Sequence, residues 1–135
     1  MSTPLLEVEH LSMHYDTLEG NVDAVKNISF TVNSGESFGL VGESGCGKTS
    51  VAMTLLQLQP ENSVITQGSI KLDGKELIGL SENDLRKVRW DSISIVFQGA
   101  MNAWNPVIKI GEQIREAMRE HYPENTKQEN INKII

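Results

Sequence analysis

Cysteine, aromatic residues and long apolar runs are all scarce in this sequence. Cys46 is the only cysteine, so no internal disulfide can form, and the first residues show neither the basic segment nor the apolar run that directs secretion. No stretch approaches the ~18 consecutive apolar residues that a membrane-spanning helix requires. A reducing cytoplasm is therefore the expected compartment, and any role at a membrane is expected to be peripheral.

Basic charge is also in short supply. The 12 Lys and Arg residues are outnumbered by 18 Asp and Glu residues, which gives a formal net charge of -6. Proteins that bind the phosphate backbone of nucleic acids need clustered cations, so DNA and RNA are not expected as partners. With 135 residues, of which 39% are hydrophobic, the chain has the size and composition of one soluble domain.

The hydrophobic periodicity predicts an antiparallel set of strands. Residues 5–15 alternate apolar and polar side chains with a phase slip after His10, and residues 24–32 alternate in the same way. The segment between them, residues 16–23, is expected to be a loop. Residues 67–77 alternate about an Asp-Gly turn, which favours a hairpin that completes the set.

Apolar runs and helical spacing predict further elements. Residues 37–42 (SFGLVG) have the composition of a strand buried in a parallel sheet, and residues 92–98 (SISIVFQ) are expected to form another strand. Helices are expected from near Lys48 to before Pro60, after the capping pair Ser81 and Asp84, and over Ile110, Ile114, Ala117 and Met118 before Pro123. The fold class is therefore α/β.

The last residues predict a helix that has barely begun. Thr126 and Glu129 repeat the capping pattern, and an apolar stripe follows at Ile131, Ile134 and Ile135. A helix of two turns buries little surface. We therefore expect the chain to be part of a longer protein.

Residues 42–49 spell G-x-x-x-x-G-K-T between a predicted buried strand and a predicted helix. Glycines at this spacing let successive N–H groups converge on an anion, and a helix N-terminus points at the same place. Lys48 is expected to reach β- and γ-phosphates, Thr49 to bind Mg²⁺, and Ser50 to bond an α-phosphate oxygen. The expected nucleotide-binding residues are Gly42, Glu43, Ser44, Gly45, Cys46, Gly47, Lys48, Thr49 and Ser50. The plainer alternative, a tight turn with a solvated lysine, leaves a cation unpaired at the positive end of a helix dipole.

Two other segments, together with this loop, resemble the nucleotide-binding subunits of ABC transporters over essentially the whole chain. Tyr15 stands 27 positions before Gly42, where that family places an aromatic ring that stacks on adenine. Residues 95–114 (IVFQGAMNAWNPVIKIGEQI) resemble the Q-loop region of the oligopeptide and dipeptide importers. The residues after Gln98 depart from it, because Gly-Ala stands where Asp-Pro is usual, and Trp104 replaces the usual Leu. Packing roles remain open alternatives for Tyr15 and Trp104, and Gln98 could instead be a strand-end residue that bonds to nearby backbone. If exposed, Trp104 would anchor a partner.

The resemblance implies a P-loop NTPase fold of the ABC type. A mixed sheet would surround the helix that follows the loop, with an antiparallel subdomain beside it and the start of a helical subdomain, and with the core incomplete in this chain. Residues 1–98 would form the core and the antiparallel subdomain, and residues 99–135 the Q-loop and the helical part. ATP and Mg²⁺ are the implied ligands, with catalytic roles for Lys48 and Gln98 and metal contacts from Thr49 and Gln98.

Several groups that the family uses for hydrolysis are not found in these 135 residues. The sequence has no apolar run followed by Asp-Glu, no LSGGQ-like run and no later switch histidine. In the family these groups hold Mg²⁺, polarise the attacking water and cap the γ-phosphate from the opposite subunit. Hydrolysis is therefore expected of the parent protein and not of this chain alone.

The resemblance also implies a role and partners. The role is ATP-driven import of oligopeptides or dipeptides from a position on the inner face of the cytoplasmic membrane. The partners are a second nucleotide-binding subunit, identical or not, the membrane-spanning permease subunits through the Q-loop region, and indirectly a peptide-binding protein. One alternative is a non-transport ABC-type ATPase that acts on nucleic acid or ribosomes. Another is a naturally short nucleotide-binding or assembly module.

Overall fold

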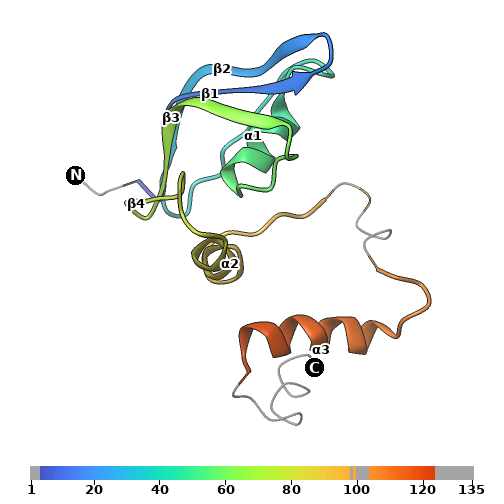
Figure 1. Ribbon diagram of the computed structural model, residues 1–135. Helices are drawn as coiled ribbons and strands as arrows, with labels where there is room; N and C mark the ends of the chain where they lie inside the picture. Colours follow the sequence, from blue (N-terminus) through green and yellow to red (C-terminus); the bar gives the residue numbers. More distant parts are fainter. Residues whose placement is uncertain (1–3, 98, 100–103, 124–135) are drawn as a thin grey trace. The chain divides into compact units, whose positions relative to one another are not determined.

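The computed structural model describes residues 4–97, 99 and 104–123, and the chain divides into two compact units, residues 1–86 and 87–135. The first unit contains β1 (Leu6–Thr17), β2 (Gly20–Val32), α1 (Lys48–Leu55), β3 (Ser63–Leu72), β4 (Lys75–Glu76) and the first half of α2 (Glu82–Asp91) (Figure 1). The second contains the rest of α2 and α3 (Ile110–His121). The chain is thus α/β, as its sequence predicts.

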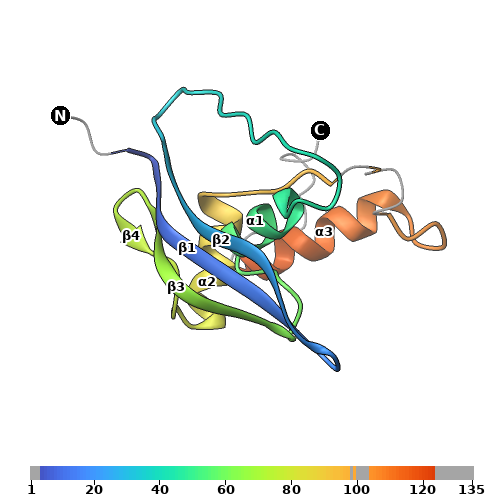
Figure 2. The ribbon, with the colours of Figure 1, turned by 90° about the horizontal axis from the view of Figure 1, so that it is seen from above.

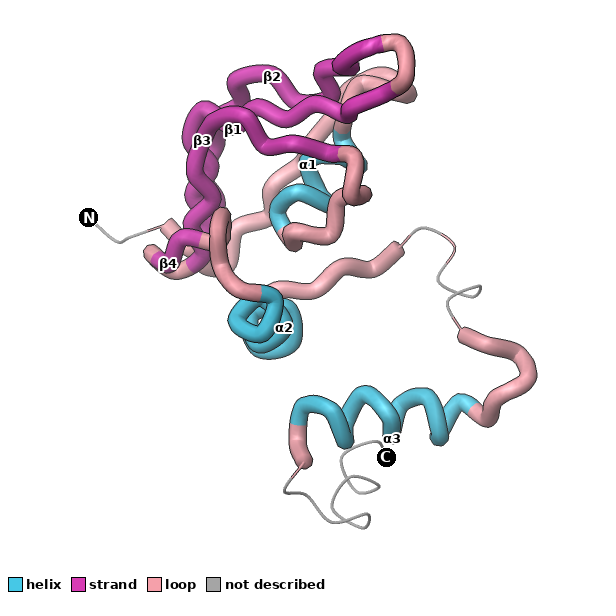
Figure 3. The backbone as a smooth tube through the Cα atoms, in the orientation of Figure 1, coloured by secondary structure: helices cyan, strands magenta, loops and turns pink. Residues whose placement is uncertain are grey.

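The four strands form one antiparallel sheet in the order β2-β1-β3-β4 (Figure 3). The three alternating segments of the sequence are therefore strands of one set, as predicted. The prediction of a loop over residues 16–23 is wrong, because Thr17 pairs directly with Gly20 across a two-residue turn. The Thr17 hydroxyl donates to the Gly20 carbonyl oxygen at 2.6 Å. This tight hairpin places Tyr15 opposite Val22.

The sheet bends where its three long strands are irregular at one level. His10 on β1 and Asn27 on β2 both have φ 49°, and Gly68 on β3 has φ 108°. The pairing register of β1 shifts against both neighbours there, which is the phase slip that the alternation predicts after His10. Side chains satisfy the displaced backbone, since the His10 N–H donates to Ser29 Oγ at 2.8 Å and the Asn27 N–H donates to Ser12 Oγ at 2.9 Å.

The core of the first unit lies on the inner side of this bend, where Figures 1 and 2 show α1. The helix begins at Lys48, as the helical spacing predicts, and contributes Val51 and Thr54 to the core, while the strands contribute most of the rest. Its buried apolar residues are Val8, Leu11, Met13, Val25, Val51, Leu56, Ile70, Leu72, Leu77 and Leu85. Burial of these side chains is the main stabilising term of the unit.

The two segments predicted as buried strands are not strands in the part of the chain that the structure describes. In residues 37–42, Phe38 is 46% exposed and Val41 93% exposed, and in the described part of residues 92–98, Val96 is 87% exposed. A parallel strand is stabilised only by hydrogen bonds to neighbouring strands and by cover on both faces. Among the described residues neither segment is paired with a strand of the sheet. Phe38 instead stacks on Phe30 of β2 at a ring-centroid distance of 4.9 Å.

One carboxylate organises the β3–β4 turn region. Glu76 accepts hydrogen bonds from the Ser69 hydroxyl at 2.6 Å and from the backbone N–H groups of Ile70, Leu77 and Ile78 at 3.0 to 3.1 Å. Burial raises the pKa of Glu76, but the Ser69 hydroxyl and the three N–H groups outweigh this effect and lower it below its ordinary value. The charged form of Glu76 therefore stabilises the fold.

Local signals in the sequence predict the other helices correctly. The Ser81 hydroxyl donates to Asp84 Oδ2 at 2.6 Å and accepts the Asp84 N–H at 3.3 Å, so the predicted pair caps the start of α2. In the second unit α3 ends at His121, two residues before Pro123. The His121 ring stacks on Trp90 of α2 with a centroid distance of 4.1 Å. The expected helix after Thr126 lies outside the described residues.

Candidate functional site

The predicted phosphate loop runs into α1 through Gly47, which is the N-cap of that helix. Gly47 has φ 90° and Gly45 has φ 81°, backbone conformations that residues with a Cβ rarely adopt. No side chain caps the helix. The N–H groups of the first turn and the positive end of the helix dipole therefore face the space in front of the loop, which is the arrangement that binds anions.

The Lys48 side chain folds back onto the backbone of the phosphate loop. Its ammonium group donates to the carbonyl oxygens of Gly42 at 2.8 Å and Glu43 at 2.5 Å, and Cys46 Sγ lies 3.4 Å away. An ammonium group has three protons on a rotatable stem, so it can turn them to a phosphate without a change in the backbone. The loop thus holds one positive charge at the start of α1.

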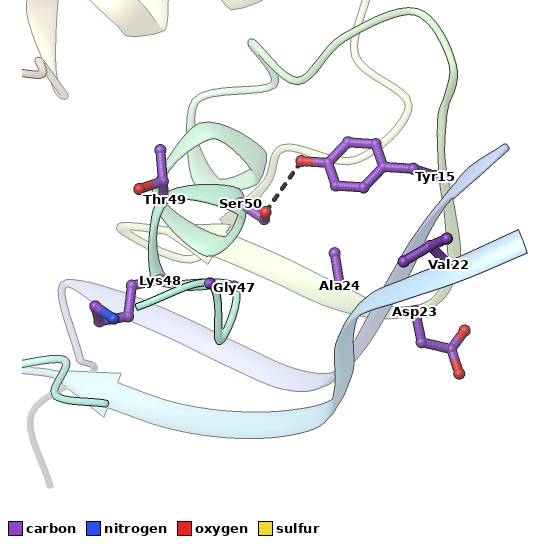
Figure 4. Close-up of a pocket in the computed structure, with 9 residues that line it drawn as sticks. Tyr15, Val22, Asp23, Ala24, Gly47, Lys48, Thr49 and Ser50 are labelled. Carbon is purple, nitrogen blue, oxygen red and sulfur yellow. Dashed lines mark hydrogen bonds between the residues drawn. The ribbon is translucent and has the colours of Figure 1, made fainter. Parts of the chain in front are cut away.

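A cleft of about 270 Å³ opens beside this loop (Figure 4). It brings together residues from three places in the sequence: the end of β1, the start of β2, and the loop with the first turn of α1. The residues that line it are Tyr15, Val22, Asp23, Ala24, Gly45, Gly47, Lys48, Thr49 and Ser50. The predicted base platform and the predicted phosphate loop therefore share one cleft.

Two close contacts hold the β1–β2 hairpin against the loop. The Tyr15 hydroxyl donates to Ser50 Oγ at 3.0 Å, and Figure 4 shows the ring reaching toward α1. At the other contact, a Cβ added to Gly47 would lie 2.2 Å from the carbonyl oxygen of Ala24. Only glycine allows this approach of loop and strand. These two contacts set the spacing between Tyr15 and the phosphate loop.

A second cavity, of about 400 Å³, shares Asp23, Ala24, Gly47 and Lys48 with the cleft. Its other lining residues are Lys26, Cys46 and the apolar residues Val25, Ile28, Leu40, Val41 and Val51. Of the two, only the cleft is also lined by Tyr15, Thr49 and Ser50, so it is the better candidate for a nucleotide.

The remaining predicted site residues differ in how well they are placed. Thr49 lies in the first turn of α1 and is exposed, and the exposed residues Glu43 and Ser44 form the outer part of the loop. Gln98 lies outside the described residues. Val22, Asp23 and Ala24 also line the cleft but are absent from the predicted set. The expected loop over residues 16–23 missed the hairpin that places the start of β2 beside Tyr15.

The second unit presents an exposed apolar segment, residues 104–110. Trp104 is 43%, Val107 90%, Ile108 43% and Ile110 57% exposed. We call this segment the apolar loop. The alternative that Trp104 is a core residue is not supported, because nearly half of its surface is accessible.

Gln113 of α3 fixes the shape of the apolar loop. Its amide donates to the carbonyl oxygens of Asn105 at 3.0 Å and Ile108 at 2.8 Å, and its Oε1 accepts the Asn105 N–H at 2.9 Å. The Asn105 side chain accepts the N–H of Val107 at 3.0 Å, which makes the predicted turn. The Asn-Pro pair and the GEQI run, which are separate in the sequence, are thus joined by hydrogen bonds.

The described residues contain neither a metal-ligand cluster nor a membrane-spanning helix. No three His, Cys, Asp or Glu side chains among them gather as a ligand set for a metal ion. In the same residues no helix is both long and apolar enough to cross a membrane. The loop and its cleft are therefore the strongest candidate for a functional site.

The chain is similar in sequence to ATP-binding proteins of peptide transport systems. The ABC transporter family model matches residues 25–135. The chain is 42% identical over 118 residues to the oligopeptide transport ATP-binding protein OppD of Haemophilus influenzae, covering 87% of this chain and 36% of that protein. It is 37% identical over 117 residues to the dipeptide transport ATP-binding protein DppD of Lactococcus lactis, covering 87% of this chain and 34% of that protein. It therefore spans about a third of the length of these curated relatives.

A solved structure shares the fold. The dimeric structure of a post-hydrolysis state of the ATP-binding cassette MJ0796, bound to ADP and Pi, has a TM-score of 0.76 to this chain at 23% sequence identity. The likeness covers 93% of this chain and 52% of that chain.

Proposed function

The chain belongs to the ABC transporter family, and on this premise we propose that it binds ATP with Mg²⁺ through residues 42–50. We further propose that the full-length protein hydrolyses ATP to drive the import of oligopeptides or dipeptides across the cytoplasmic membrane. The observation that carries the proposal is the shared cleft, in which Tyr15 of the hairpin faces the start of α1, with Lys48 inside the loop.

The residues of the cleft fit an adenine nucleotide by their chemistry. Tyr15 offers an aromatic face for the base, and stacking of a base on such a face is worth about 1–3 kcal/mol. Lys48 and the uncapped N-terminus of α1 offer positive charge for the phosphates. Thr49 is the residue that would bind Mg²⁺, which enters as part of the substrate complex, and Ser50 is the residue that would bond the α-phosphate. Gln98 would reach the Mg²⁺ and the attacking water.

The proposed role in peptide import rests on the names of the relatives, which are transport ATP-binding proteins for oligopeptides and dipeptides. A role on nucleic acid or ribosomes has no comparable support, and the net charge of -6 opposes it. We propose a second nucleotide-binding subunit as one partner, since the cassette with the similar fold is dimeric. Both subunits would lie on the inner face of the membrane.

The apolar loop is the proposed contact with the membrane-spanning subunits. Exposed apolar side chains held in a defined shape are typical of a surface that a partner covers. Four such side chains lie within seven residues, and Gln113 holds the backbone that carries them. A peptide-binding protein would act indirectly, on the other side of the membrane.

Transport by the organism itself tests the proposal. Deletion of the gene should reduce uptake of a labelled oligopeptide, and the wild-type gene should restore it. Lys48→Ala should not restore uptake, whereas Lys75→Ala, an exposed lysine of β4 outside the cleft, should restore it fully. Normal peptide uptake by the deletion strain, or full rescue by Lys48→Ala, would contradict the proposal.

The 135-residue chain alone should bind ATP·Mg²⁺ weakly and hydrolyse it negligibly. It lacks the Asp-Glu pair and the signature run that the family uses to position the attacking water and the γ-phosphate. Release of phosphate from ATP by the isolated chain measures this directly. Robust turnover that disappears in Lys48→Ala would show that the chain supplies its own catalytic groups and that this reasoning is wrong.

A further inference from the structure

One hydrogen bond connects the two ends of the cleft. Tyr15 lies near the end of β1, Ser50 lies in the first turn of α1, and the Tyr15 hydroxyl donates to Ser50 Oγ at 3.0 Å (Figure 4). The two residues are 35 positions apart, and the bond is partly buried. The bond can form only when the hairpin packs against the phosphate loop, so it is a feature of the folded site and not of local sequence.

The Tyr15 phenol is a stronger acid than the Ser50 hydroxyl, so it is the better donor in this bond, and this direction sets what the Ser50 hydroxyl can do. A serine hydroxyl has one proton to donate and two lone pairs that accept. Since Ser50 Oγ accepts the proton of Tyr15, it keeps its own proton for another acceptor. Ser50 lines the cleft together with Gly45, Gly47 and Lys48, the part of the site that attracts an anion.

We propose that Tyr15 is a positioning residue for the phosphate side of the cleft. Its hydroxyl orients the Ser50 hydroxyl so that the Ser50 proton is donated to a phosphate oxygen of the nucleotide, while its ring serves the base. Without the tyrosine hydroxyl, Ser50 Oγ is free to rotate among its staggered rotamers and to turn its proton elsewhere. The inference rests on the proposed function, because it requires a nucleotide phosphate in the cleft.

A double-mutant cycle on ADP binding tests this inference. Tyr15→Phe keeps the aromatic ring and removes only the hydroxyl, and Ser50→Ala removes the group that it orients. Each should weaken ADP binding in calorimetry by roughly three- to tenfold, the net value of one hydrogen bond. The double variant should be no weaker than the more affected single variant, because the two groups act in one path. Tyr122→Phe, a matched change in the second unit, should leave ADP binding unchanged.

Additional variants keep the test decisive. Ser50→Thr retains a hydroxyl, so Tyr15→Phe should again cost a similar factor in that background. Ser50→Gly provides a second variant without the hydroxyl in case thermal denaturation shows that Ser50→Ala does not fold. Adenosine has no phosphate, so its binding should not respond to Tyr15→Phe.

The outcomes separate this inference from the proposed function. Losses that add in the double variant, or an undiminished ADP affinity in Tyr15→Phe, would overturn the positioning role and leave nucleotide binding intact. An equal loss for adenosine and ADP would also overturn it, because the hydroxyl would then serve the base. Failure of the wild-type chain to bind ADP or ATP at all would overturn the proposed function and the inference with it.

Discussion

Replacement of Gly47 by alanine should distort the phosphate loop and weaken nucleotide binding. Gly47 has φ 90°, which costs an alanine about 1–2 kcal/mol in the left-handed region. Its added Cβ would also lie 2.2 Å from the Ala24 carbonyl oxygen, whereas real Cβ atoms stay beyond 3.0 Å. The loop or β2 must therefore move by about 1 Å, and misplacement on this scale disrupts a positioned site.

The expected result is a loss of ATP affinity of roughly ten- to hundredfold in Gly47→Ala, equivalent to about 1.4–2.8 kcal/mol. Competition titration with a fluorescent ATP analogue measures it, and urea denaturation measures the accompanying loss of stability. Gly74→Ala is the matched control. Gly74 has φ 74° in the turn between β3 and β4, and an added Cβ meets no atom within 4 Å. It should lose about 1–2 kcal/mol of stability with no change in ATP affinity.

The comparison of the two glycines decides the argument. If Gly47→Ala binds ATP as tightly as the wild type, the close approach of the loop to β2 does not set the geometry of the site. If Gly74→Ala weakens ATP binding as much as Gly47→Ala does, the loss follows from general destabilisation. Either result would refute the reasoning from the Ala24 contact.

Three further substitutions have outcomes that follow from the structure. The pKa of Glu76 is lowered in the fold, so its stabilisation is complete above its ordinary pKa of 4.5 and is lost as the pH falls through the lower folded value. Glu76→Gln should therefore cost about 1–3 kcal/mol in urea denaturation at pH 7 and progressively less in acid, while Glu61→Gln at an exposed position should cost under about 0.5 kcal/mol. Gly68→Ala should lower the melting temperature by several degrees, because its Cβ would lie 2.5 Å from the β1 backbone; an unchanged melting temperature would contradict this. Gln113→Leu should abolish peptide uptake but leave ATP affinity unchanged, because Gln113 holds the backbone of the apolar loop. Glu116→Gln is the neutral control on α3. Normal uptake by Gln113→Leu would contradict the proposed role of the apolar loop.

Local chemistry made much of the fold predictable from the sequence. The phase slip after His10, the capping pair Ser81 and Asp84, and the start of α1 at Lys48 each depend on residues within one or two turns of chain. The same is true of the phosphate loop, whose spacing specifies its own shape through glycine conformations. Because neighbouring residues determine these features, they can be predicted from short segments of the sequence.

Features that depend on partners distant in the sequence were not predictable in this way. The hairpin turn at Leu18 and Glu19 lacks the Asn-Gly or Gly-Gly signal of a tight turn, so the register that opposes Tyr15 to Val22 was missed. The runs at 37–42 and 92–98 have the composition of strands, but composition does not supply the neighbouring strands that such segments need. The contact of Tyr15 with Ser50 likewise requires the folded hairpin.

Direct binding of ATP to the loop is the central claim, and titration of ATP·Mg²⁺ into the wild-type chain tests it most directly. We predict saturable binding that excess ADP competes away, that Lys48→Ala abolishes, and that Lys75→Ala leaves intact. Lys48 lies inside the loop and bonds its carbonyl oxygens, whereas Lys75 lies on β4. Absence of saturable binding in the wild type, or equal binding by Lys48→Ala, would contradict the account.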